Sequence, residues 1–157
     1  MKKLLSTLFT LFIVLSASAH AVFIETSLKG TKGVPHALKI VYGEPNEHEL
    51  VSKWWWYKEG MQINLTLIKP DGSTSTLATT AQGDHLSATF VPDQDGVYHV
   101  SLKRDTERKE GAKTQYQINA IATIQVGHST LGNTASHLAN ELFVFAGQTS
   151  FKNKKEV

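Results

Sequence analysis

The chain of 157 residues is long enough for one globular domain, and its hydrophobic (41%) and charged (19%) fractions exclude a disordered or fibrous protein. Its 16 Lys and Arg residues nearly balance its 14 Asp and Glu residues, so charge gives no reason to expect nucleic acid or an anionic membrane surface as a partner. The lack of cysteine excludes disulfides, thiolate metal sites, a cysteine nucleophile and a lipid anchor on cysteine.

The first segment has the composition of a secretory signal peptide. Two lysines open it, residues 4–15 are mostly apolar, and residues 17–19 (Ala-Ser-Ala) are the small residues that a signal peptidase reads. The apolar run is too short to cross roughly 30 Å of hydrocarbon as a membrane anchor. We therefore expect residues 1–19 to be a signal peptide, the protein to be periplasmic or secreted, and no part of it to insert in the membrane after cleavage.

Cleavage after Ala19 makes His20 the first residue of the mature chain. The α-amino group and the imidazole of an N-terminal histidine can chelate one metal ion, and with a pKa of about 8 this amine can lose its proton to a strong Lewis acid. Two nitrogens from one residue, together with a second imidazole, suit the tetragonal nitrogen ligation that Cu(II) prefers. Cleavage after Ala21 fits the same small-residue rule and would remove His20, so both cut sites remain open.

Residues 20–127 alternate between apolar and polar side chains with the period of a β-strand, and Gly, Pro and Asp separate the runs. The core-facing stripes are predicted at Leu38, Ile40 and Tyr42, at Ile63, Leu65 and Leu67, at Leu86, Ala88 and Phe90, at Tyr98, Val100 and Leu102, and at Tyr116, Ile118, Ala120, Ala122, Ile124 and Val126. Short strands separated by turn residues predict an all-β protein with an immunoglobulin-like antiparallel β-sandwich over residues 20–127.

A turn followed by Gly-x-Tyr at residues 95–98 resembles the tyrosine corner of immunoglobulin-like folds. The Tyr98 side chain is therefore expected to point into the core and to hydrogen-bond the preceding backbone. His99 is expected to project from the outer face of the strand, because consecutive side chains alternate.

The tail, residues 128–157, has a different pattern. It begins like a linker, contains a strand-like run at residues 142–145 (Leu-Phe-Val-Phe), and ends in a lysine-rich stretch. The tail either adds an edge strand to the sandwich or begins a second β domain that the chain does not complete, and the second interpretation is slightly favoured.

Histidine is the commonest metal ligand where cysteine is absent, and seven histidines follow the predicted cleavage site. His36 opens a strand after a short turn at residues 30–33, so we expect it to lie beside His20 and to supply the second imidazole; a half-buried residue at the end of a sheet is the alternative. His99 is the next candidate, with a solvated surface residue as the alternative. The remaining candidates are weaker or discounted on position: His85 on a loop, and His128 and His137 in the tail.

Residues 43–49 (Gly-Glu-Pro-Asn-Glu-His-Glu) place three carboxylates around the imidazole of His48. A neighbouring carboxylate, such as that of Glu44, can orient a histidine ring or complete a metal site with an oxygen ligand. A solvated acidic loop is an equally good interpretation of the same residues.

The aromatic run Trp54-Trp55-Trp56-Tyr57 follows this acidic segment. Consecutive residues of an extended segment cannot all face the core, so at least one ring is expected on the surface. An exposed ring there can bind a protein partner or a carbohydrate, or cover a buried site.

Several short motifs within residues 20–126 carry a family resemblance. They are His20 to Thr26 (His-Ala-Val-Phe-Ile-Glu-Thr), Gly33, His36, Tyr42-Gly43-Glu44, Pro70-Asp71-Gly72 and Asp95-Gly96-Val97-Tyr98. With the signal peptide ending directly before them, they resemble a family of exported bacterial proteins of unknown function, often described as periplasmic components linked to nickel or cobalt uptake. More distantly, an N-terminal histidine on a sandwich is similar to the copper-resistance protein C family, although no Asp-x-His pair occurs late in this sandwich.

The resemblance implies a metal ion as the ligand and a membrane transporter or another periplasmic protein as the partner. The sequence contains no Gly-x-Ser-x-Gly, His-Glu-x-x-His, phosphate-binding or dinucleotide-binding pattern, so ordinary hydrolase chemistry is not expected. The leading hypothesis is a non-enzymatic periplasmic module that binds or delivers divalent copper or nickel. Its candidate ligands are His20, His36, His99, His48 and Glu44.

Two other functions remain as alternatives at this stage. The first is a carbohydrate- or partner-binding sandwich that uses the aromatic cluster from Trp54 to Tyr57. The second is a copper oxygenase acting on polysaccharide, which also needs an N-terminal histidine. The small size of the domain weakens the second alternative, since such enzymes usually need a broad, flat substrate face.

Overall fold

The computed structural model describes residues 20–44, 47–58, 60–61, 63–105, 111 and 117–133. These residues form strands arranged in two sheets, with one short 3-10 turn, η1 (Val51–Lys53). The predicted signal peptide, Tyr116, His137 and the strand-like run at residues 142–145 lie outside the described residues.

The first sheet, sheet A, is antiparallel throughout. Its spatial order is β1 (Ala21–Glu25), β3 (His36–Glu44), β8 (His85–Phe90) and β7 (Thr80–Gln82), and the short strand β4 (Glu47–His48) also pairs with β3. β4 and β8 pair with different parts of β3, so the β7–β8 turn reaches the neighbourhood of β4.

The second sheet, sheet B, is antiparallel except for one short parallel pair. Its spatial order is β2 (Lys29–Gly30), β10 (Gln117–Val126), β9 (Gly96–Asp105), β5 (Asn64–Ile68) and β6 (Thr74–Thr76). β2 pairs in parallel with the last two residues of β10. The long β9 and β10 are joined in register along their whole length.

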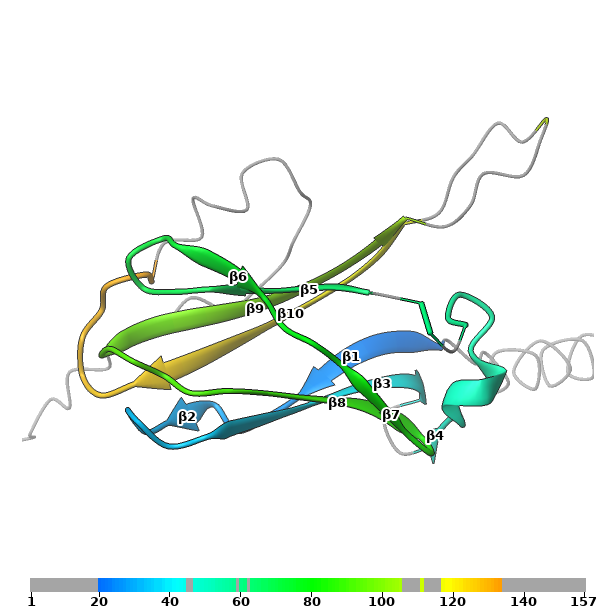
Figure 1. Ribbon diagram of the computed structural model, residues 1–157, viewed down its shortest axis with the longest axis horizontal. Coiled ribbons are helices and arrows are strands. Elements are labelled where there is room, and N and C mark those ends of the chain that lie inside the picture. The colour runs from blue at the N-terminus through cyan, green and yellow to red at the C-terminus, as the bar shows by residue number, and fades with distance from the viewer. Residues whose placement is uncertain are drawn as a thin grey trace, which may run out of the picture.

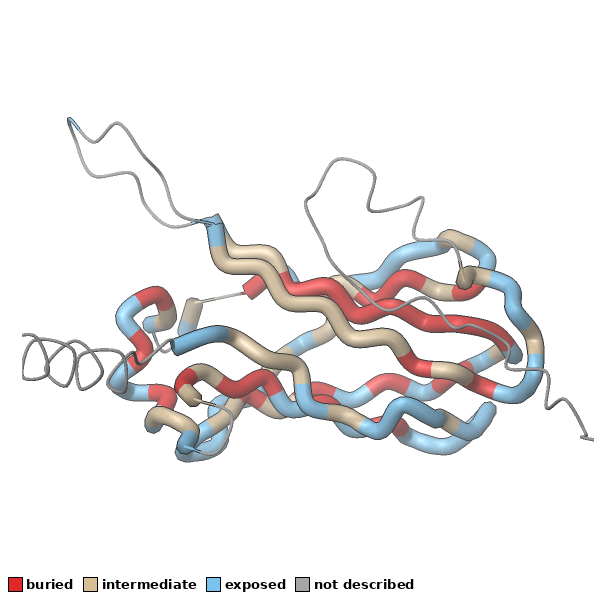
Figure 2. The backbone as a smooth tube through the Cα atoms, turned by 180° about the vertical axis from the view of Figure 1, so that it is seen from behind, coloured by how far each residue is buried: buried red, intermediate tan, exposed pale blue. Residues whose placement is uncertain are grey.

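The two sheets lie face to face, with sheet A below sheet B in Figure 1. Figure 2 shows buried residues alternating with exposed or half-buried ones along most strands, as expected when one face of each strand packs against the opposite sheet. The prediction of an all-β sandwich is therefore confirmed. The immunoglobulin-like arrangement of its strands stays a prediction.

The core follows the predicted stripes closely. Leu65, Tyr98 and Val100 are completely buried, and they belong to one apolar cluster that both sheets share. Ile118 packs against this cluster but is only half-buried. Figure 1 explains the difference, because the end of β9 and the start of β10, where Ile118 lies, diverge from sheet A.

The Tyr98 hydroxyl makes the local hydrogen bonds that the corner motif predicts. It accepts the backbone N–H groups of Asp93 (3.1 Å) and Gln94 (3.0 Å), and it donates to Oδ1 of Asp93 at 2.9 Å. These bonds fasten the loop before β9 to the strand itself, which closes one end of the sandwich.

Candidate metal centre

The pairing of β1 with β3 decides which residues lie near His20. Ala21 lies opposite Gly43, so His20, one residue earlier, lies next to Glu44. His36 is the first residue of the 9-residue β3 and Glu44 the last, roughly 25 Å apart at about 3.3 Å per residue. The prediction that His36 lies beside His20 is therefore wrong. In an antiparallel pair, the start of β3 lies beside the end of β1, whereas His20 precedes the start of β1.

His36 belongs to the core at the opposite end of sheet A. It is only 7% exposed, and its ring centroid is 5.4 Å from that of Phe90. The Thr26 hydroxyl donates to the carbonyl of Ala37 at 2.8 Å, so Nε2 of His36, also at 2.8 Å, must donate to that hydroxyl. This buried, hydrogen-bonded imidazole has a structural role.

His99 lies on the outer face of β9, but the alternative interpretation, a solvated surface residue, is wrong. It is only 2% exposed, because the turn residues after β10 fold over it. Its Nε2–H donates to the carbonyl of Gly132 at 2.8 Å, and Nδ1 lies 3.1 Å from the Thr123 hydroxyl. His99 is therefore also separated from His20, and it fastens residues 128–133 to sheet B.

His20 itself lies between two carboxylates. Its Nε2 atom is 2.9 Å from Oε1 of Glu49, and its Nδ1 atom is 3.9 Å from Oε1 of Glu44. The three side chains are about one-third exposed, so an ion can reach them from solvent. The ring of Tyr42 lies 5.6 Å from the imidazole, centroid to centroid, and forms a wall beside it.

These distances assign the tautomer of the neutral His20 ring. A carboxylate can only accept, so at 2.9 Å it is Nε2 that carries the proton and donates it to Glu49. The lone pair of the neutral ring is then on Nδ1, on the side of Glu44, at a distance too long for a hydrogen bond. The side of the ring that faces Glu44 therefore has an acceptor nitrogen near an acceptor oxygen.

The backbone holds Glu49 in position. Its N–H donates to the carbonyl of Tyr42 at 2.8 Å, and its own carbonyl accepts the indole N–H of Trp54 at 2.9 Å. The chain also needs glycine at position 43, where φ is +138° and a Cβ atom would lie 2.5 Å from the carbonyl oxygen of Glu47. The close return of β4 along β3 therefore places the Glu49 carboxylate beside His20.

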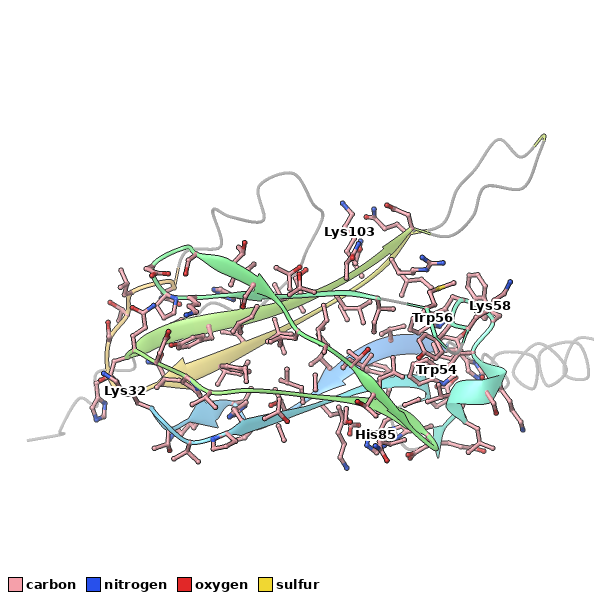
Figure 3. The ribbon with its side chains drawn as sticks, in the orientation of Figure 1. Lys32, Trp54, Trp56, Lys58, His85 and Lys103 are labelled. Atoms are coloured by element: carbon pink, nitrogen blue, oxygen red, sulfur yellow. The ribbon has the colours of Figure 1, made fainter. Side chains whose placement is uncertain are left out.

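The aromatic run is divided between core and surface. Trp54 and Trp56 are buried and stacked with ring centroids 5.0 Å apart, and Figure 3 places them at the right-hand end of the sandwich. Trp55 is 60% exposed, and its indole N–H donates to the Tyr42 hydroxyl at 2.9 Å. The expectation of at least one surface ring is confirmed, and the two buried tryptophans pack edge-on against Tyr42, with ring centroids 6.0–6.1 Å apart.

A second histidine–carboxylate group lies on the other face of sheet A. Glu25 is an odd number of residues along β1 from His20, so the two side chains point to opposite faces. Nε2 of His48 is 3.2 Å from Oε1 of Glu25, and its Nδ1 is 3.8 Å from Oδ2 of Asp84. Nδ1 of His85 is 2.8 Å from Oδ1 of Asp84, and this hydrogen bond holds the pKa of that carboxyl below its usual range.

The local sequence pattern assigned these partners differently. It placed the carboxylates of residues 43–49 around His48, whereas two of them contact His20. His85 joins His48 because β8 and β4 pair with neighbouring parts of β3. Asp84 and His85 are neighbours in the sequence, but only the pairing of distant strands brings His48 and Glu25 to them, so no local signal could have found the whole group.

Within the described parts of the chain, no three His, Asp or Glu side chains surround a common point as a preformed metal site would require. The same residues contain no helix of the length and apolarity needed to cross a bilayer. A scan against protein-family models found no match to this chain, and neither did a search of curated proteins. The family resemblance stays a prediction, and the function proposed below is argued from the positions of the side chains around His20.

Proposed function

We propose that the mature protein is an exported module that binds or delivers a divalent copper or nickel ion through an N-terminal His20. The observation that carries this proposal is the orientation of the His20 ring, with Nε2 held by Glu49 and Nδ1 turned toward Glu44. Cleavage after Ala19 adds the α-amino nitrogen, which completes a donor set that the side chains alone do not provide.

The orientation of the ring matches what the chelate needs. An N-terminal histidine chelates through its amine and Nδ1, because these two nitrogens close a small, unstrained ring with the ion, whereas Nε2 lies on the far side of the imidazole. Metal-bound histidines usually donate their other ring N–H to a carboxylate, which fixes the tautomer and makes the ligand more basic. Glu49 has the place of that orienting carboxylate.

Glu44 supports an oxygen ligand on the metal side of the ring. The Glu44 carboxylate oxygen lies 3.9 Å from Nδ1, close enough for both atoms to bind one ion after a small movement. The amine nitrogen, the imidazole nitrogen and this oxygen would then supply three ligands of the nitrogen and oxygen types that Cu(II) and Ni(II) bind. The fourth position stays available to a ligand from a partner, which suits delivery to a membrane transporter or another periplasmic protein.

The deciding experiment compares the secreted protein with a version that carries Gly-Ser-Gly-Ser before His20. This length is needed because one or two added residues still allow an amine and the imidazole to bind the same ion. Titration calorimetry with Cu(II) and Ni(II) should show the affinity of the tightest site falling at least 100-fold, since even the loss of an orienting group costs about 10–100-fold. The mass of the secreted protein identifies its first residue.

Thermal unfolding of both proteins provides the control for intact folding. An extended protein that folds normally and binds both ions as tightly as the native one would show that no N-terminal site exists. A secreted protein that begins after Ala21 would overturn the proposal directly, because it would lack the ligand.

A partner- or carbohydrate-binding surface is the second candidate, and the 60% exposure of Trp55 favours it. Trp55→Ala should then abolish retention on an immobilised polysaccharide or partner while leaving the affinity for Ni(II) unchanged. Equal retention of the variant and the native protein would remove this candidate.

A further inference from the structure

Two histidines far apart in the sequence, His48 and His85, meet at one carboxylate on the outer face of sheet A. Oδ1 of Asp84 is 2.8 Å from Nδ1 of His85, and Oδ2 of the same residue is 3.8 Å from Nδ1 of His48. Figure 3 shows His85 on the lower, outer side of this sheet. Both Nδ1 atoms therefore face the same carboxylate.

The arrangement around His48 repeats the one around His20. In each ring Nε2 lies against one carboxylate, that of Glu25 at 3.2 Å or that of Glu49 at 2.9 Å. In each ring Nδ1 faces a second carboxylate across a wider distance, 3.8 Å for His48 and 3.9 Å for His20. Because Glu25 can only accept, the lone pair of the neutral His48 ring is on Nδ1 and faces Asp84.

We propose that His48, Asp84 and His85 form a second metal site, which takes a first-row divalent ion such as Ni(II) or Zn(II) through two imidazole nitrogens and one carboxylate oxygen. This mixture of nitrogen and oxygen donors is the one that such ions bind in proteins without cysteine. Glu25 orients the His48 ring from behind. The site uses neither His20 nor the α-amino group, so it is independent of the function proposed above.

The side chains must move to enclose an ion, because no three of the described His, Asp and Glu side chains surround one point. The group that moves most is Asp84, whose side chain is 52% exposed and follows Gly83 in the β7–β8 turn. His85 must also transfer its proton from Nδ1 to Nε2 through water, so that the Nδ1 lone pair replaces the hydrogen bond to Asp84. Neither change disturbs the apolar core.

The test uses the protein with Gly-Ser-Gly-Ser before His20, in which the amine chelate is absent. Calorimetric titration with Ni(II), and separately with Zn(II), should show one equivalent of ion bound per chain. The double variant His48→Gln and His85→Gln should lose at least 100-fold in affinity for that ion. His128→Gln is the matched control, because it removes an exposed histidine from the turn after β10 and should change nothing.

A second measurement needs no substitution at the site, which matters if the double variant folds poorly. Cu(II) added below one equivalent to the extended protein broadens the NMR signals of the rings it binds, so the His48 and His85 ring protons should broaden first. The signals of His36 and His99 should stay sharp. An extended protein that binds neither Ni(II) nor Zn(II), or that broadens His128 first, would overturn the second site.

The two proposals fail in different ways. Tight binding that survives the N-terminal extension unchanged removes the His20 site and leaves the second one standing. Tight binding by the native terminus, with none by the extended protein, leaves the His20 site and removes the second.

Discussion

The two ends of the sandwich use histidine differently. At the end closed by the loop before β9, His36 is buried against the Thr26 hydroxyl, and His99 donates to a backbone carbonyl. At the end formed by β4 and η1, His20 and His48 are partly exposed and each faces two carboxylates. The sequence alone does not separate the two pairs, since all four histidines are candidate ligands there.

The chemistry of the partner separates the two roles. A hydroxyl or a carbonyl holds a neutral ring in one tautomer and offers no charge, so the imidazole serves as a buried hydrogen-bonding group. A carboxylate stabilises positive charge on or beside the ring, whether from a proton or from a metal ion. We call the end closed by the loop before β9 the closed end, and the end formed by β4 and η1 the open end. Substitutions of histidines at the closed end should affect stability, and those at the open end should affect ion binding.

The largest expected effect is at the closed end. His36→Ala should lower the free energy of unfolding by about 2 kcal/mol, because it leaves a cavity beside Phe90 and removes the donor to Thr26. The affinity for Ni(II) should not change. Urea denaturation and calorimetric titration measure the two quantities. A variant with native stability and weakened ion binding would break the comparison.

The next effect sharpens the comparison at the open end. Glu49→Gln keeps a hydrogen-bond acceptor for Nε2 of His20 but removes its charge, so the affinity for Cu(II) should fall about 10-fold. Glu47→Gln is the matched control, because Glu47 is exposed on the same hairpin and its loss removes the same charge. Equal losses in both variants would mean that the hairpin acts only through its total charge.

Much of the fold could be predicted because burial follows alternation. Leu65 and Val100 lie on predicted stripes and are completely buried. Trp54 and Trp56 could not be placed in this way, since they follow the turn η1, where the period of a strand does not apply. They are buried because they pack on the apolar core at the end of the sandwich formed by β4 and η1.

The candidate site could be predicted only in part, because strand pairing is not a local property. The signal-peptide pattern singled out His20, and the acidic segment singled out Glu44, which proves to be its neighbour. The error over His36 came from treating a short turn as if it brought the starts of both strands together. The contacts of His48 with β1 and with the β7–β8 turn depend on three strand pairings at once.

The smallest expected effect concerns Tyr98 at the closed end. Tyr98→Phe should lower the free energy of unfolding by about 1 kcal/mol at neutral pH, because the N–H groups of Asp93 and Gln94 lose their acceptor. The midpoint of urea denaturation measures this loss. An unchanged midpoint would mean that the hydroxyl does not fasten the loop.

The same variant should respond less to acid than the native protein does. Hydrogen bonds from Lys69 and then from Tyr98 hold the pKa of Asp93 below its usual value. A carboxyl with a lowered folded-state pKa adds stability that is fully present above its unfolded pKa of about 3.9 and is lost as the pH falls through the folded value. The native protein has both bonds to lose and the variant only one, so the difference between their midpoints should shrink from pH 7 to about pH 2.5. A difference that stays constant or grows would show that the Tyr98 hydroxyl acts on the backbone alone and not through the Asp93 carboxylate.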